Sequence, residues 1–161
     1  MLDIYIDADG CPVKEEIYKI ARRHDLKVTV VSNKPIRIPM DDRYGLQVVG
    51  DRLDEVDDWI AGHAAADDIV VTADIPLAAR CLANSAAVLN PRGGEFTEDN
   101  IGSALANREL MSHLRDIGEK SSGPAPFQPA DRSRFLHKLD ETIRLIRRRR
   151  LLKPPARPDA S

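Results

Sequence analysis

The stretch LDIYIDADGCP, residues 2–12, determines the fold class of this chain, because an apolar run ends in acidic residues and a proline follows. The run at 2–6 predicts a buried strand of a parallel sheet, and Pro12 is tolerated in the first turn of a helix. The segment DIVVTADIP, residues 68–76, repeats this order of apolar run, Asp74 and proline. Ligands of parallel α/β sheets bind beyond the carboxyl ends of the strands, so we expect Asp7 and Asp74 to face one crevice.

Strand and helix patterns alternate through the first half of the chain, which predicts a parallel sheet with helices on its faces. The expected strands are 2–6, 27–32, 46–49, 69–72 and 87–89, and the expected helices are 12–24, 53–63, 75–83, 97–117 and 131–150. Thr97 and Asp131 are expected to cap the last two helices, and NPRGGEFT (90–97) to form a loop. Apolar residues at helical spacing in these two helices need a surface to cover, including Ile101, Leu105 and Leu110.

The chain of 161 residues is long enough for one domain with a real core, which we place at 1–150. A Pro- and Ser-rich stretch at 121–130 is expected to be an extended linker, and 151–161 a disordered, basic and Pro-rich tail. The net charge of −2 hides an asymmetry, since residues 1–130 hold 14 Lys and Arg against 22 Asp and Glu, and residues 131–161 hold 10 against 4. The basic end is expected either to attract phosphates toward an acidic crevice or merely to keep the protein soluble.

Several classes of protein are disfavoured by the composition. No apolar stretch approaches the roughly 18 residues needed to cross a bilayer, and no signal peptide precedes the first strand. Cys11 and Cys81 lie far apart without a CxxC partner, so a reducing cytoplasm is expected. The histidines form no HxH or HExxH spacing, which argues against zinc. Cys11 falls in a first helical turn, but no acid or His at a suitable spacing supports a nucleophile, and a buried small thiol is the preferred interpretation.

Acidic residues that packing does not explain predict the chemistry of the crevice. Carboxylates that share a crevice repel one another and attract a hard divalent cation, Mg²⁺ or Mn²⁺. Such ions would activate water for attack on a phosphodiester. We expect catalysis by Asp7, Asp57 and Asp74, and metal binding by Asp7, Asp9, Asp54, Asp57 and Asp74.

Simpler explanations exist for three of these acids. Asp74 and Asp9 each stand where an N-cap would, and Asp54 places a favourable charge at a helix N-terminus. Asp57 shares a helix face with Asp54 but lies further along the helix, where neither explanation applies.

Polar and basic residues in loops at the same edge of the sheet predict phosphate binding, namely Ser32, Asn33, Lys34, Arg37 and Arg92. The glycines after Arg92 let backbone N–H groups turn toward an anion. The alternative for Arg92 is that it bridges helices through ion pairs and backbone carbonyls. Aromatic residues make up 4% of the chain, so nucleic-acid affinity is expected to come from phosphate contacts rather than base stacking.

Two family resemblances compete. IDADG, VVSNK and VVGDRLDEVDD are similar to the three motifs of haloacid-dehalogenase-type phosphatases, which would make Asp7 a nucleophile, but here the motifs are compressed into about fifty residues. DADGCPV, VSNKPIRIP, VDDWI, VTADIPLAARCL, NPRGGEFT, GPAPF and DRSRF resemble the YaiI/YqxD family of bacterial proteins over nearly the whole chain. Gly10 departs from the Ala that is common in that family, and the Arg-rich tail is not part of its pattern.

The second resemblance implies a three-layer Rossmann-like fold of PIN type, with a mostly parallel sheet and C-terminal helices. By this resemblance Asp7 matches the first PIN acid, Asp57 or Asp54 the helical acid, and Asp74 the acid after the fourth strand. It favours RNA over DNA as the partner of a metal-dependent nuclease. A catalytically silent PIN-like module that binds nucleic acid is the non-enzymatic alternative.

Overall fold

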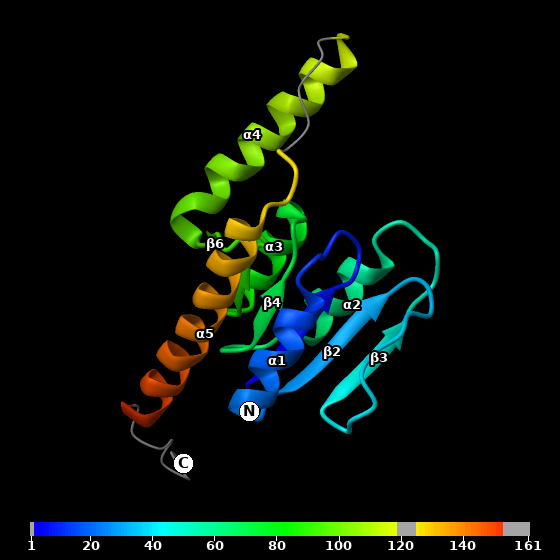
Figure 1. Cartoon of the computed structure of the whole chain (residues 1–161). Coiled ribbons are helices and arrows are strands. Elements are labelled where there is room, and N and C mark those ends of the chain that lie inside the picture. Colours follow the sequence, from blue (N-terminus) through cyan, green and yellow to red (C-terminus); the bar gives the residue numbers. More distant parts are fainter. Residues whose placement is uncertain (1, 119–124, 153–161) are drawn as a thin grey trace, which may run out of the picture.

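The fold is a three-layer α/β sandwich, seen in the computed structural model of residues 2–118 and 125–152 (Figure 1). Its central sheet has the strand order β3-β2-β1-β4-β5-β6, in which β1 to β5 run parallel and β6 runs antiparallel to β5. The strands are β1 (Asp3–Asp7), β2 (Lys27–Ser32), β3 (Tyr44–Val48), β4 (Ile69–Val71), β5 (Ala87–Leu89) and β6 (Glu95–Phe96). The predicted parallel sheet of a Rossmann-like fold is confirmed.

The helices are α1 (Lys14–His24), α2 (Glu55–His63), α3 (Ile75–Ala83), α4 (Glu98–Asp116) and α5 (Pro129–Leu152). Side chains alternate between the two faces of a strand, so Ile4 and Ile6 of β1 pack toward α1 and α5, while Tyr5 packs toward α2 and α3. Both faces are covered, which explains the nearly continuous apolar runs of the strands. None of the helices in the described part of the chain is long and apolar enough to cross a membrane.

A short sixth strand replaces part of the loop predicted at 90–97. Asn90 closes the turn before it, because its side-chain oxygen accepts the backbone N–H groups of Arg92 at 2.8 Å and Gly94 at 3.1 Å. The chain then reverses and pairs Glu95 with Leu89 and Phe96 with Val88. The glycines indicate the turn in the sequence. The two-residue strand after it cannot be predicted in the same way, because it forms only by pairing with β5.

The boundaries of α5 differ from the prediction at both ends. The helix begins at Pro129, so Asp131 is not its N-cap; instead its carboxylate accepts the backbone N–H of Gln128 at 2.9 Å, which is the reciprocal half of a capping box. The helix continues to Leu152, two residues into the predicted tail. The rest of that tail, 153–161, and residues 121–124 of the predicted linker lie outside the described residues.

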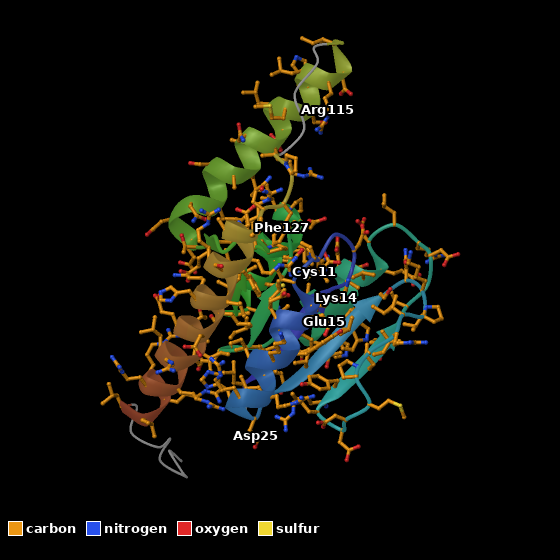
Figure 2. All side chains as sticks on the ribbon, viewed as in Figure 1. Cys11, Lys14, Glu15, Asp25, Arg115 and Phe127 are labelled. Atoms are coloured by element: carbon orange, nitrogen blue, oxygen red, sulfur yellow. The ribbon has the colours of Figure 1, made fainter. Side chains whose placement is uncertain are left out.

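Helix α4 is only partly covered. Thr97 caps it as predicted, since its hydroxyl accepts the backbone N–H of Asn100 at 3.2 Å. In turn, the side-chain oxygen of Asn100 accepts the backbone N–H of Thr97 at 2.9 Å. Ile101 packs half-buried with the α3 layer. The second half of the helix extends past the sheet, where Figure 2 labels Arg115, and Leu110 is 53% exposed there. The expectation that Leu110 has a surface to cover is therefore not met in the described part of the chain, whereas Ile101 of the same helix does pack.

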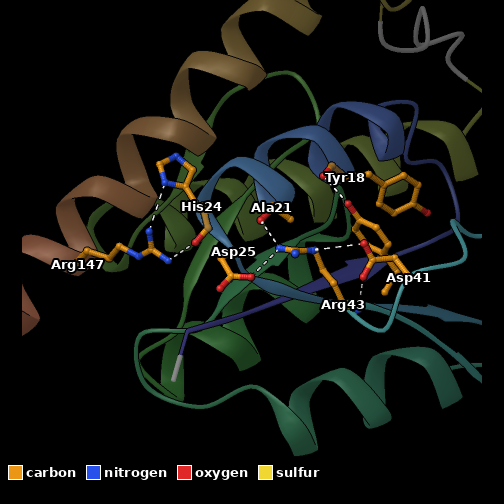
Figure 3. A network of polar contacts seen from close by, with 8 residues as sticks. Tyr18, Ala21, His24, Asp25, Asp41, Arg43 and Arg147 are labelled. Atoms are coloured by element: carbon orange, nitrogen blue, oxygen red, sulfur yellow. Dashed lines mark hydrogen bonds and ion pairs between the residues drawn. The ribbon is translucent and has the colours of Figure 1, made fainter.

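Polar contacts fasten the amino edge of the sheet (Figure 3). Arg43 donates to the backbone oxygen of Ala21 at 3.3 Å and to the Asp25 carboxylate at 3.0 Å, which joins the loop before β3 to the end of α1. Arg147 of α5 donates to the backbone oxygen of His24. These contacts tie α1, β3 and α5 together at the edge opposite to the carboxyl ends of the strands.

Candidate active-site cleft

A cleft of about 740 Å³ opens at the carboxyl edge of the sheet. Its lining comes from the ends of β1 and β2, from the segment that leads into α2, and from Asp74 after β4. The cleft thus reaches the place between β1 and β4 where the chain turns from one half of the sheet to the other, the position at which open α/β sheets bind ligands. The lining residues are Asp7, Ala8, Asp9, Lys14, Val31, Ser32, Asn33, Lys34, Ile36, Asp51, Arg52, Leu53, Asp54, Val56, Asp57 and Asp74. All five acids singled out in the sequence therefore face one cleft, together with Ser32, Asn33 and Lys34.

Asp7 forms the deepest part of this acidic group. It ends β1 with 9% of its surface exposed, and its Oδ2 accepts the Thr72 hydroxyl at 2.8 Å. Burial raises the pKa of Asp7, the Thr72 hydrogen bond opposes that rise, and the charges of Asp74 and Asp9 add to it. The carboxylate is thus held in place by a hydrogen bond, while its burial and its acidic neighbours disfavour its charged form.

Asp74 caps a helix and lines the cleft at the same time. Its Oδ1 accepts the backbone N–H of Leu77 at 2.9 Å, which is the N-cap bond of α3. Its own backbone N–H donates to the Thr72 hydroxyl at 3.0 Å. Capping uses one carboxylate oxygen, so the structural role of Asp74 leaves the other oxygen for a ligand.

Asp57 has the largest perturbation among the cleft acids. Its pKa is raised from 3.8 to about 6, first by burial and then by the negative charges of Asp74, Asp7 and Asp54, while the charge of Arg80 opposes the rise. Asp54 precedes α2 with a φ of 74° and makes no side-chain cap bond, so helix capping does not account for its position. A positive φ is uncommon for residues other than glycine and is tolerated best by Asn and Asp. The acids of β1, α2 and the β4–α3 turn therefore act electrostatically on one another.

The positive charges of the cleft come from more places than the sequence indicated. Lys34 lines it as predicted, whereas Arg37 of the same loop is exposed and lies outside the lining. Lys14 and Arg52 were not singled out. Lys14 stands in the first turn of α1, where its ammonium donates to the backbone oxygen of Cys11 at 3.2 Å (Figure 2). The principle that ligands bind beyond the carboxyl ends of parallel strands predicts a site position for Lys14 as well as for Asp7, since both lie where β1 leads into α1.

Arg92 does not line the cleft. Its guanidinium donates to the Asp131 carboxylate at 3.0 Å and to the backbone oxygen of Ala125, and lies 5.8 Å from the ring centre of Phe127. These contacts match the helix-bridging interpretation of Arg92. The structure thus gives no support to Arg92 as a phosphate ligand, because it lies outside the cleft lining and two of its nitrogens donate to Asp131 and Ala125.

The basic end of α5 lies at the wrong edge of the sheet to serve the cleft. Arg149 and Arg150 pair with Asp67 at 3.7 and 3.4 Å, and Asp67 lies in the turn before β4, at the amino edge. The expectation that the C-terminal charge assists the acidic crevice is not met by the described arginines. The basic side chains that line the cleft are instead Lys14, Lys34 and Arg52.

The donor set suits a hydrated magnesium ion rather than a closed metal cage. Within residues 2–118 and 125–152, no group of three Asp, Glu, His or Cys side chains is assembled closely enough to hold a metal ion. Mg²⁺ usually keeps several waters and binds through one or two carboxylates plus substrate phosphates. Asp7 and Asp74 each have one oxygen without a bond described above, and Asp57 lies within their electrostatic reach, so these residues fit Mg²⁺ or Mn²⁺ by chemistry.

The two cysteines are both buried and unpaired. Burial raises the pKa of Cys11, and it raises that of Cys81 to about 11. Neither thiol is therefore a thiolate at neutral pH, which agrees with the interpretation of Cys11 as a small buried side chain.

Comparison with known proteins identifies the family. The family model described as "Uncharacterized BCR, YaiI/YqxD family" matches residues 5–145. A UPF0178 protein of Bradyrhizobium sp. (strain ORS 278) is 51% identical over 149 residues, which cover 92% of this chain and 91% of that protein. A UPF0178 protein of Azorhizobium caulinodans is 54% identical, over 91% of this chain and 92% of that protein. A UPF0178 protein of Rhodospirillum centenum is 52% identical, over 93% of this chain and 100% of that protein. No solved structure matches this chain.

Proposed function

We propose that this chain, which belongs to the YaiI/YqxD family, is a divalent-metal-dependent phosphodiesterase that cleaves RNA in preference to DNA. One observation carries the proposal. Carboxylates from three separate elements, Asp7, Asp57 and Asp74, face one cleft, where burial and then their mutual repulsion raise the pKa of Asp7 and Asp57. Perturbed acids gathered in a cleft are typical of a functional site, because a fold gains no stability from crowding like charges.

The residues of the cleft divide into two roles. Asp7 and Asp74 would hold Mg²⁺ or Mn²⁺, which supplies charge stabilisation at the phosphate and lowers the pKa of a bound water. Asp57, with a pKa of about 6, is partly protonated near neutrality and suits proton transfer at the attacking water or the leaving oxygen. Lys14 and Lys34 would bind phosphates that flank the scissile one. The preference for RNA rests on the PIN-like resemblance of the sequence.

The nearby alternative is a phosphatase with Asp7 as nucleophile. The chain passes from the end of β1 at Asp7 to the start of α1 at Lys14 through two tight turns. That superfamily needs an excursion after its first strand to cover the nucleophile, and this connection leaves no room for one. The phosphodiesterase therefore accounts better for the geometry.

The test is a single substrate panel on the full chain. Single-stranded RNA, single-stranded DNA and a generic phosphomonoester are incubated with Mg²⁺, with Mn²⁺ and with chelator. Metal-dependent cleavage of RNA supports the proposal. Binding of RNA in chelator without turnover in metal indicates a binding module, and monoester hydrolysis with intact RNA indicates the phosphatase.

Variants assign any activity to the cleft. The double variant Asp7→Asn with Asp74→Asn should abolish cleavage and metal binding measured by calorimetry, and each single variant should weaken metal binding. Asp42→Asn is the matched control, because Asp42 is an exposed aspartate outside the cleft lining. If the double variant Asp7→Asn with Asp74→Asn binds metal as the wild type does, the assigned site is wrong.

A further inference from the structure

Thr72 connects the two acids that flank the cleft floor. It follows β4 with 1% of its surface exposed, and its backbone N–H donates to the Leu89 oxygen of β5 at 3.0 Å. Its hydroxyl donates to Asp7 Oδ2 at 2.8 Å and accepts the backbone N–H of Asp74 at 3.0 Å. One buried hydroxyl, fixed to the neighbouring strand, thus contacts both acids.

The direction of these bonds follows from their partners. A backbone N–H can only donate, so toward Asp74 the hydroxyl must be the acceptor. The single hydroxyl proton is then free to point at Asp7, which makes Oδ2 of Asp7 the acceptor. One lone pair of Oδ2 is thus held by the protein, and a backbone hydrogen bond with Asp9 also acts on this carboxylate, whose remaining lone pairs can bind a ligand.

The same pattern holds for Asp74. Its Oδ1 accepts the N-cap bond from Leu77 at 2.9 Å, which leaves Oδ2. Thr72 sets the start of this turn through the Asp74 backbone. Each acid therefore has one oxygen that the protein orients by a hydrogen bond, and both acids line the cleft. Thr72 fixes the first acid directly and the second through its main chain.

We propose that Thr72 is a positioning residue that orients the Asp7 and Asp74 carboxylates toward a divalent cation. This inference rests on the proposed function, because it takes the two acids to be metal ligands. Partners that hydrogen-bond to metal ligands fix the orientation of those ligands, and their loss typically weakens metal binding about 10–100-fold. Thr72 has no contact with substrate in this role and acts only through the two acids.

The experiment measures Mn²⁺ affinity by calorimetry on the full chain and its Thr72 variants. Thr72→Val keeps the shape of the side chain but removes the hydroxyl, and should weaken Mn²⁺ binding by about tenfold or more. Thr72→Ser keeps the hydroxyl and should restore the affinity of the wild type. Should Thr72→Val not fold, Thr72→Ala removes the same hydroxyl with less crowding of the Asp7 carboxylate.

A double-mutant cycle separates positioning from a general structural role. In the Asp7→Asn background, Thr72→Val should weaken the remaining Mn²⁺ binding much less than in the wild type, since much of its effect passes through Asp7. The inference is overturned if folded Thr72→Val binds Mn²⁺ as tightly as the wild type, or if Thr72→Ser binds as weakly as Thr72→Val. If the wild type itself does not bind Mn²⁺, both this inference and the proposed function fail. If the wild type binds Mn²⁺ but the Thr72 variants behave as just described, only this inference fails, so the two failures are distinguishable.

Discussion

The Arg92 guanidinium donates to the Asp131 carboxylate at 3.0 Å and thereby joins the turn after β5 to the first turn of α5. A second donor of Arg92 reaches the Ala125 backbone oxygen, which a lysine ammonium at the same place would not serve together with Asp131. Arg92→Lys should therefore lower the melting temperature by roughly 2–4 °C. Cleavage of RNA per folded molecule should stay unchanged. A strong loss of activity with an unchanged melting temperature would contradict this structural role and indicate that Arg92 takes part in catalysis.

Gly93 is required by a close approach between the same turn and α5. Its φ is +91°, and a Cβ atom there would lie 2.7 Å from the backbone carbon of Arg134. Gly93→Ala should destabilise the protein by at least about 1–2 kcal/mol, the cost of the left-handed conformation alone, with the clash added to it. Denaturant unfolding measures the change.

Gly102 provides the opposite control for Gly93. It lies within α4, and a Cβ there would meet no atom within 4 Å. Gly102→Ala should stabilise the protein by about 0.5–1 kcal/mol, because alanine is favoured over glycine inside a helix. Equal effects of the two substitutions would contradict the tight contact assigned to Gly93.

Asp57 should make the protein less stable at neutral pH than in mild acid. Its pKa rises from 3.8 to about 6 on folding, so the folded state holds the proton more tightly than the unfolded chain. The resulting stabilisation is fully present below the unfolded pKa and is lost as the pH rises through the folded pKa. Asp57→Asn should therefore raise the melting temperature at about pH 8 and leave it nearly unchanged at about pH 4.

Asp58 is the matched control for this pH dependence. It is exposed, lies next to Asp57 on α2, and pairs with Arg80 at 2.8 Å. Asp58→Asn should produce no gain at either pH, because it removes an attraction rather than a repulsion. If Asp57→Asn fails to stabilise at the higher pH, the burial and the charge repulsion that raise the pKa of Asp57 are weaker than described.

Lys34 and Arg37 form a matched pair for the nucleic-acid interface, since they belong to one loop and only Lys34 lines the cleft. Lys34→Gln should weaken binding of single-stranded RNA and reduce the slope of log affinity against log salt by about 0.7, the value for one phosphate contact. Arg37→Gln should change neither quantity by a comparable amount. Fluorescence anisotropy in chelator, measured over a salt series, compares them. Affinity that does not vary with salt would contradict a phosphate-driven interface.

The sequence locates the cleft because strand ends can be recognised locally. Asp7 and Asp74 each follow an apolar run, and a parallel sheet brings such ends to one edge whatever the order of its strands. The sequence also indicates Asp57 as a site residue, because it lies too far along its helix for helix capping to explain an acid there.

Sequence patterns predict less about residues whose role depends on partners far away in the chain. The contacts of Arg92 are with Asp131, Ala125 and Phe127, which lie more than thirty residues away in the chain, so its loop position suggested a cleft residue instead. The arginines of α5 were expected to serve the cleft because charge alone does not tell which edge of the sheet a helix end reaches. Thr72 reads as the last residue of a buried strand, and its two hydrogen bonds become visible only when β1 and β4 are neighbours.

The crowding of negative charge around Asp57 means that the melting temperature of the protein can be used to find its ligands. Any ion that enters the cleft and binds only the folded chain shifts the unfolding equilibrium in proportion to the logarithm of its concentration over its dissociation constant. The ranking of cations, nucleotides and phosphate esters by the melting temperature they produce would therefore rank their affinities. The Asp7→Asn variant would show which of those shifts arise in the cleft, so the substrate could be sought without an assay for the reaction.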